Sequence, residues 1–212
     1  IYRCDWSSDV CSSDLIPVIN ALTDDDHPTQ LLADWLTIRE HFGADISGRK
    51  FVYLGDGNNM SHAWLLMGAI MGAHVVAATP EGKFAPDPTV VAKAREIAVR
   101  SGATVEVTHD PEAAAKDASV LYTDVWMSMG DPESERAEKI AALSPFAVDD
   151  RLMSLTAQDS IFMHCLPAHR GEEVAASVID GAKSVIWREA YHRRTTIQAL
   201  LYHLTRGEIK GA

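Results

Sequence analysis

The chain has 212 residues, of which 47% are hydrophobic and 23% are charged, a composition typical of a folded globular protein. Its 30 acidic and 19 basic residues give a formal net charge of −11, which argues against nucleic acid or an anionic membrane as the main partner. No apolar run approaches the ~18 residues of a membrane span and no signal peptide is recognisable, so we expect a cytoplasmic protein.

Residues 1–14 show neither helical nor strand periodicity, and a Ser-Ser-Asp-apolar unit occurs twice, at 7–10 and 12–15. They resemble translated sequencing-adapter sequence, so we predict a non-native leader over residues 1–15. A loop closed by a Cys4–Cys11 disulfide, or a natural tail, is the alternative. Without this segment Cys165 is the one remaining cysteine, which is typical of a protein from a reducing compartment.

The next stretch predicts a short strand and then a helix. Residues 16–20 form an apolar run suited to a buried strand, and three aspartates at 24–26 precede a helix with Pro28 in its first turn and Gly43 after its end. One face of this helix is apolar and is expected to be buried. Its members are Leu31, Trp35, Ile38 and Phe42, with Leu32 and Leu36 beside them.

From residue 50 onward, predicted strands alternate with amphipathic helices. The strands are expected at 50–55, 74–78, 104–108, 119–123, 160–163 and 184–187, and the helices at 59–71, at 88–101, after Pro111 and at 189–206. This alternation predicts an α/β fold with a doubly wound parallel sheet. In such sheets ligands bind beyond the carboxyl ends of the strands, where the strand order reverses.

The strand at 50–55 leads into Gly55-Asp56-Gly57-Asn58-Asn59, a glycine-bearing turn before a helix. A dinucleotide binds to turns of this kind, although Met60 stands where the dinucleotide fingerprint has its third glycine. A tight turn capped by one of the asparagines explains the same residues. A nicotinamide-dependent dehydrogenase domain therefore stays open as an alternative function.

Two later strands also end in polar groups. Asp124 and, on the loop behind it, Ser128 suit the ammonium and carboxylate of an amino acid, with a helix cap or a solvated loop as the alternative. Cys165 at the end of another strand is a buried hydrophobe, a nucleophile or a neighbour of a ligand amine. Neither a CxxC motif nor paired histidine spacing indicates zinc.

Two further groups suggest an anionic ligand. His27 and Gln30, at the start of the first predicted helix, supply an imidazole and an amide that can donate to an oxyanion. Arg193 and Arg194 stand where the last helix is predicted to start, and a cation opposes the helix dipole there. A solvated surface pair is the alternative for the two arginines.

Taken in order, these motifs resemble those of the ornithine carbamoyltransferases, from about residue 16 to the end of the chain. The four segments are His-Pro-Thr-Gln at 27–30, Gly-Asp-Gly-Asn-Asn at 55–59, Asp-Val-Trp-Met-Ser-Met-Gly at 124–130 and His-Cys-Leu-Pro at 164–167. The related aspartate carbamoyltransferases share a His-Pro-x-Gln motif but lack the Ser-Met-Gly loop. The amino-acid side of the site therefore favours ornithine.

The resemblance implies transfer of the carbamoyl group from carbamoyl phosphate to the δ-amine of L-ornithine, giving citrulline and phosphate without a cofactor or a metal. It implies that His27, Gln30 and Arg193 bind the carbamoyl oxygen and that the Leu166 carbonyl binds the carbamoyl NH2. Cys165 is also among the implied carbamoyl-phosphate-binding residues and lies beside the δ-amine, where it would assist the orientation or deprotonation of that amine. Cys165, His27 and Arg193 are thus the implied catalytic residues. The α-amino and α-carboxyl ends of ornithine would be held by Asn59, Asp124, Ser128 and Met129.

Two departures from the family pattern shape the expected organisation. The phosphate-binding Ser-Thr-Arg-Thr segment is absent, and Tyr191-His192-Arg193 replaces a Glu-Asn-Arg motif, which leaves Arg194 as an alternative to Arg193. We expect a remnant of the carbamoyl-phosphate domain with a crossover helix at 16–42, an ornithine-binding domain at 43–188 and a second crossover helix at 189–212.

The missing segment also bears on the physical state of the chain. Family members are trimers held largely through the domain that is lacking here. We therefore expect neither the native trimer nor turnover of carbamoyl phosphate from this chain alone. A non-catalytic α/β module that binds an amino acid is the remaining alternative.

Overall fold

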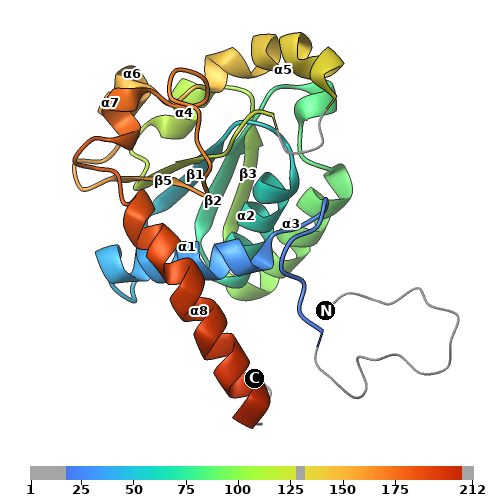
Figure 1. Cartoon of the computed structure of the whole chain (residues 1–212), viewed down its shortest axis with the longest axis vertical. Helices are drawn as coiled ribbons and strands as arrows, with labels where there is room; N and C mark the ends of the chain where they lie inside the picture. Colours follow the sequence, from blue (N-terminus) through green and yellow to red (C-terminus); the bar gives the residue numbers. More distant parts are fainter. Residues whose placement is uncertain (1–17, 128–131, 207–212) are drawn as a thin grey trace, which may run out of the picture.

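The computed structural model describes residues 18–127 and 132–206 (Figure 1). A sheet of five parallel strands runs in the order β3-β2-β1-β4-β5. The strands are β1 (Lys50–Leu54), β2 (His74–Ala78), β3 (Thr104–Thr108), β4 (Val120–Thr123) and β5 (Ile161–His164). The order reverses between β1 and β4, so the predicted doubly wound α/β fold is confirmed.

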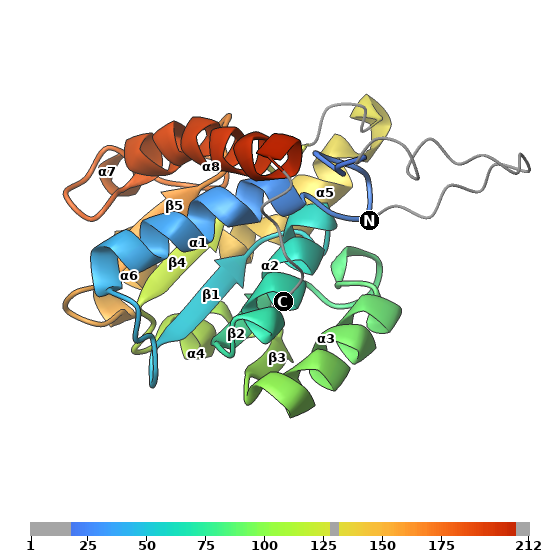
Figure 2. The ribbon, with the colours of Figure 1, turned by 90° about the horizontal axis from the view of Figure 1, so that it is seen from below.

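Helices cover both faces of the sheet. One face carries α1 (Pro28–Phe42), α2 (Asn59–Ile70), α3 (Pro88–Ser101) and α8 (Ile186–Arg206), and the other carries α4 (Pro111–Ala115), α6 (Asp150–Leu155) and α7 (Ala176–Ile179). The remaining helical segments are α5 (Arg136–Leu143), η2 (Gly82–Phe84), η3 (Glu133–Glu135) and η4 (Ser144–Phe146). Figure 2 shows α1 and α8 packed side by side.

Side chains of the strands alternate between two hydrophobic cores. In β1, Phe51 and Tyr53 belong to the core beneath α1, α2 and α3, whereas Val52 and Leu54 belong to the core beneath α4, α6 and α7. All four side chains are fully buried. Burial on both faces is the reason that these strands appear in the sequence as apolar runs rather than as an alternating pattern.

Several helix boundaries follow the local chemistry that the sequence indicates. Asp87 caps α3 by accepting a hydrogen bond from Thr89 N at 2.7 Å, and Gly102 ends that helix in the left-handed region with φ of +79°. Asp110 caps α4 in the same way through Glu112 N and Ala113 N. The first residue of α1 is Pro28, as predicted, but the cap is His27 and its side chain makes no capping bond.

Two predicted strands are wrong. Within the run at 16–20, the described residues 18–20 have no regular structure, and Val18 is half exposed because no strand of the sheet pairs with it. At 184–187, Ser184 forms only an isolated bridge with Phe162, and α8 already begins at Ile186. The last helix therefore starts three residues before the predicted position 189.

The earlier start of α8 also changes the position of the two arginines. Arg193 and Arg194 lie two turns inside the helix rather than at its start. The interaction of a helix dipole with charge falls off within the first turn, so the dipole argument for an anionic partner at these residues does not hold.

Among the helices of the described residues, none is both long enough and apolar enough to cross a lipid bilayer.

Candidate functional site

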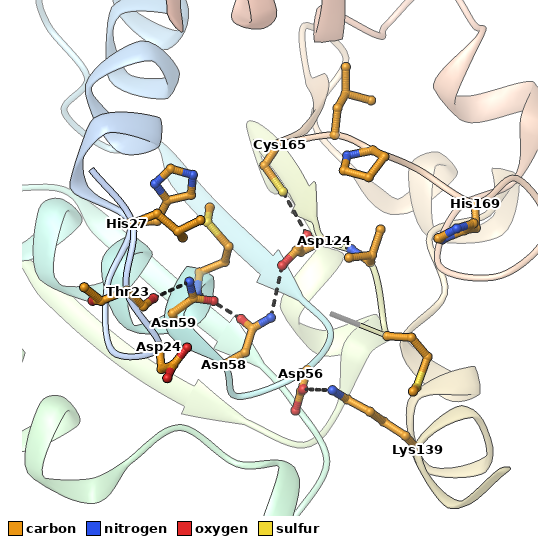
Figure 3. A pocket seen from close by; sticks show the side chains of 16 residues that line it. Thr23, Asp24, His27, Asp56, Asn58, Asn59, Asp124, Lys139, Cys165 and His169 are labelled. Carbon is orange, nitrogen blue, oxygen red and sulfur yellow. Dashed lines mark hydrogen bonds and ion pairs between the residues drawn. The ribbon is translucent and has the colours of Figure 1, made fainter. Parts of the chain in front are cut away.

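A cavity of about 1020 Å³ lies at the carboxyl ends of β1, β4 and β5, where the strand order reverses (Figure 3). It is lined by Leu22, Thr23, Asp24, His27, Asp56, Asn58, Asn59, Met60, Asp124, Val125, Met127, Lys139, Cys165, Leu166, Pro167 and His169. Five residues predicted from sequence motifs far apart in the chain meet here, namely His27, Asn59, Asp124, Cys165 and Leu166.

Asp124, directly after β4, is held in place by three hydrogen bonds. Its Oδ1 accepts hydrogen bonds from Val125 N at 2.7 Å and from the Cys165 thiol at 2.9 Å, and its Oδ2 accepts from Asn58 Nδ2 at 3.0 Å. Figure 3 shows the two side-chain donors on either side of the carboxylate. A carboxylate held in this way presents a fixed negative charge to a ligand ammonium.

Cys165 follows β5 and serves as a hydrogen-bond donor. Burial raises the pKa of its thiol well above the ordinary value, and the negative charge of Asp124 raises it further. Because the thiolate is the nucleophilic form, the thiol in this position is neither a nucleophile nor a base at neutral pH. Of the three interpretations of Cys165, the raised pKa argues against the nucleophile.

We expect Cys165 to react slowly with iodoacetamide at neutral pH, and replacement of Asp124 by asparagine to speed the reaction. Removal of the adjacent negative charge lowers the pKa of the thiol, and one pKa unit is a tenfold change in the thiolate fraction. Mass spectrometry of the Cys165 peptide gives the rate. An equal rate in wild-type and Asp124→Asn protein contradicts the role of Asp124.

The turn between β1 and α2 is filled by the chain itself. A Cβ atom on Gly57 would lie 2.2 Å from the backbone of Ala85, and Gly57 N donates to Phe84 O at 2.8 Å. At the start of α2, Asn58 Oδ1 accepts hydrogen bonds from Met60 N and Ser61 N. These glycine and helix N–H groups are therefore not available to a pyrophosphate, which argues against a dinucleotide in this turn.

His27 and Asn59 fasten the segment before α1 to the cavity. Asn59 Nδ2 donates to Thr23 O at 2.9 Å, and His27 Nδ1 is 2.7 Å from Ala21 O. A carbonyl oxygen only accepts, so Nδ1 carries the hydrogen. Burial lowers the pKa of His27, so the neutral ring offers Nε2 as an acceptor rather than as the predicted donor.

Gln30 and Arg193 contact each other beside the cavity and are not among the residues that line it. Arg193 Nη1 donates to Gln30 Oε1, while Gln30 Nε2 donates to Asp34 Oδ1 and Glu189 Oε1. The amide nitrogen is thus already engaged, which differs from the prediction that Gln30 donates to a ligand oxygen. Arg193 is the member of this pair with a donor to offer.

Lys139 of α5 lines the cavity and was not anticipated, because no helix was predicted over 136–143. Its Nζ lies 2.7 Å from Asp56 Oδ2, and the two side chains are only 9% and 11% exposed. With Asp24 and Asp124, the described residues of the lining supply three carboxylates against this one ammonium group. The balance of charge favours a cationic ligand.

Leu166, between Cys165 and Pro167, has a backbone conformation that non-glycine residues rarely adopt, with φ of +58°. Strained backbone of this kind is concentrated at ligand-binding sites. Ser128 and Met129, the other residues predicted to hold the ends of ornithine, lie outside the described residues.

One group of side chains in the described ranges has the spacing of a metal site. Ligand atoms of His169, Glu172 and Glu173 lie within 4.8 Å of one another. Glu172 is bound by Arg136 at 2.6 Å, and Glu173 Oε1 is 3.3 Å from His164 Nε2. Each of the two glutamates thus has a protein partner among the described residues.

Two family models match this chain, and both describe domains of the same family. The family described as aspartate/ornithine carbamoyltransferase, Asp/Orn binding domain, matches residues 47–204, and its carbamoyl-P binding domain matches residues 2–40. The second match includes most of the predicted leader.

Similar individual proteins are named ornithine carbamoyltransferase. Ornithine carbamoyltransferases of Acidothermus cellulolyticus and Anoxybacillus flavithermus are 51% and 52% identical over 189 residues, which is 89% of this chain and 60% and 59% of theirs. The crystal structure of ornithine carbamoyltransferase from Gloeobacter violaceus aligns with a TM-score of 0.81 at 46% identity, over 89% of this chain and 62% of that one. The chain thus spans about 60% of the length of these relatives. Together, the match over residues 47–204 and the shared fold show that the chain belongs to the aspartate/ornithine carbamoyltransferase family.

Proposed function

We propose that this chain forms the amino-acid side of an ornithine carbamoyltransferase site. The observation that carries the proposal is the fixed carboxylate of Asp124 between Cys165 and Asn58, in a cavity whose carboxylates outnumber its ammonium groups. L-Ornithine is a cationic amino acid, so its ammonium groups complement this lining. The names of the relatives support ornithine as the substrate.

The proposed reaction transfers the carbamoyl group of carbamoyl phosphate to the δ-amine of ornithine, and citrulline and phosphate are the products. An amine with a lysine-like pKa of about 10.4 must lose a proton before it attacks the carbonyl carbon. In the proposed complex Asp124 and Asn59, with Ser128 and Met129, hold the α-amino and α-carboxyl ends. Cys165, as a neutral thiol, orients the δ-amine and does not remove its proton, which passes to solvent before the amine attacks.

On the carbamoyl side, the proposal assigns the carbamoyl NH2 to acceptors and its oxygen to a donor. His27 Nε2 and the Leu166 carbonyl are the acceptors. Arg193, which is held by Gln30 Oε1 beside the cavity, is the cation that stabilises charge on the oxygen. No metal and no cofactor takes part in this scheme. We also propose that a trimer in the cytoplasm is the complete enzyme and that its citrulline enters arginine biosynthesis or the urea cycle.

Calorimetric titration of the purified chain tests the proposal. L-Ornithine is expected to bind, L-aspartate is expected not to bind, and carbamoyl phosphate is expected not to be turned over by this chain alone. NADH fluorescence measured on the same sample is expected to stay unchanged. A folded chain, verified by circular dichroism, that binds no ornithine contradicts the proposal, and enhancement of NADH fluorescence favours the dehydrogenase alternative.

A further inference from the structure

Two carboxyl groups lie side by side in the interior next to the cavity. Asp34 of α1 and Glu189 of α8 are both 0% exposed. A single nitrogen, Gln30 Nε2, donates to Asp34 Oδ1 at 2.7 Å and to Glu189 Oε1 at 2.9 Å. Two oxygens bound to the same nitrogen are separated by only a few ångströms, so these carboxyl groups are immediate neighbours.

The groups that face this pair come from α1, α8, β4 and β5. They are Gln30 and Arg193, the Tyr122 hydroxyl at 3.5 Å from Glu189 Oε1, and the backbone N–H of His164 at 3.0 Å from Glu189 Oε2. Among these described neighbours Arg193 is the cation, so one positive charge faces two carboxyl groups. Two adjacent charged carboxylates without solvent are unfavourable, and one of them is expected to hold a proton.

The hydrogen bonds fit a single shared proton. Asp34 Oδ2 is buried and meets no donor in the described part of the chain, as expected of a carboxyl oxygen that itself carries or shares a hydrogen. Burial raises the pKa of Asp34 to about 7, and burial together with the neighbouring Asp34 raises the pKa of Glu189 well above its ordinary value. The two groups titrate as a unit.

This arrangement fixes the orientation of Gln30. If the amide were flipped, its oxygen would face two carboxyl oxygens, so Nε2 points to the pair and Oε1 points to Arg193. Glu189 also binds His164 N, one residue before Cys165. We propose that Asp34 and Glu189 share one proton at neutral pH and act as positioning residues that hold Gln30 and Arg193 beside the cavity.

The importance for catalysis of holding Gln30 and Arg193 beside the cavity rests on the proposed function. The proposal of a shared proton does not depend on that function. Loss of the proton would add a negative charge beside Arg193 and weaken the attraction of this region for an anionic ligand. Titration of Asp34 makes the free energy of unfolding decrease as the pH rises. The pKa of Asp34 is raised from 3.8 to about 7 in the folded state, so the protonated Asp34 stabilises the fold. This stabilisation is fully present below about pH 4 and is lost as the pH rises toward 7.

Infrared spectroscopy of the whole chain tests the proposal without any substitution. At pH 7 we expect the carbonyl band of a protonated carboxylic acid, which shifts when aspartate or glutamate is labelled with ¹³C at the carboxyl carbon. The band is expected to disappear in Asp34→Asn and in Glu189→Gln, because either change leaves a single carboxylate opposite Arg193. Asp159→Asn, at a half-exposed residue paired with Arg49, is the matched control and is expected to keep the band.

A second readout separates positioning from a general structural role. Asparagine at position 34 still offers an oxygen to Gln30, so the side-chain amide resonances of Gln30 are expected to stay protected from exchange in Asp34→Asn and to lose protection in Asp34→Ala. A wild-type spectrum without a protonated carboxyl band at pH 7 overturns the proposal, as does a band that persists in both single variants. Failure of ornithine to bind would refute the proposed function while leaving this result unaffected.

Discussion

Replacement of Asp124 by asparagine is expected to weaken L-ornithine binding about 10- to 100-fold. The carboxylate is fixed by three donors at the end of β4 and faces the cavity, so its charge is directed at a ligand ammonium. A hydrogen bond to a charged partner contributes about 1.5–3 kcal/mol, and 1.4 kcal/mol corresponds to a factor of ten. Calorimetry on both proteins measures the difference in affinity.

The same change at a second aspartate provides the control. Asp159 precedes β5, at the amino end of the sheet, and pairs with Arg49 at 2.9 Å. Asp159→Asn also removes one negative charge from the protein and is expected to leave the ornithine affinity unchanged. L-Norvaline, which lacks the δ-amine, identifies the contacted group: Asp124→Asn should weaken norvaline as much as ornithine if Asp124 binds the α-amine. Equal affinity for ornithine in wild-type and Asp124→Asn protein contradicts the assignment.

The strands at 74–78 and 104–108 could be predicted to the residue because turn and loop residues in the sequence stand at the ends of these strands. Each is a short run of mostly apolar or β-branched residues between a glycine-containing turn and a loop. The caps Asp87 and Asp110 act through bonds to residues two and three positions away. Helix caps and turn residues of this kind can be recognised from a single sequence.

The wrong and missed elements of secondary structure occur where the local sequence fits a strand and a helix equally well. Val185-Ile186-Trp187 suits a strand by composition, yet only one rung of pairing with Phe162 forms before α8 begins. A short apolar run does not distinguish a strand from the first turn of a helix, and packing on the sheet decides the outcome. The short helices α5, α6 and α7 were missed for a related reason, since four to eight residues give little periodicity.

The site was predicted where functional groups follow strands or open helices, and missed where they lie inside helices. Asp124 directly follows a predicted strand and Cys165 comes two residues after one, whereas Asp34, Lys139 and Glu189 are polar residues within helices. In the sequence such residues look like part of a solvated face. Asp34 offers one signal in hindsight, because it lies four residues after Gln30 on the apolar side of α1.

Replacement of Trp64 by alanine is expected to lower the free energy of unfolding by about 3–5 kcal/mol, the range found when a buried large aromatic residue is truncated. Trp64 lies on α2, is 0% exposed, and its ring centroid is 4.7 Å from that of Tyr122 and 6.3 Å from that of Trp35. The indole thus fills the space where α1 and α2 meet β4. The cavity left by alanine would remove packing beneath α1, the helix that carries Gln30 and Asp34, and urea unfolding measures the loss.

Two further variants separate this packing from other effects of the substitution. Trp64→Phe keeps an aromatic ring in the core and removes an indole N–H that has no acceptor in the described structure, so a loss of less than about 1.5 kcal/mol is expected. Trp187→Ala changes the same residue type on α8, where the side chain is 72% exposed, and is expected to alter stability by no more than about 0.5 kcal/mol. Equal losses in Trp64→Ala and Trp187→Ala would show that burial against Tyr122 and Trp35 does not stabilise the fold, because the two changes differ in their surroundings and not in the atoms removed.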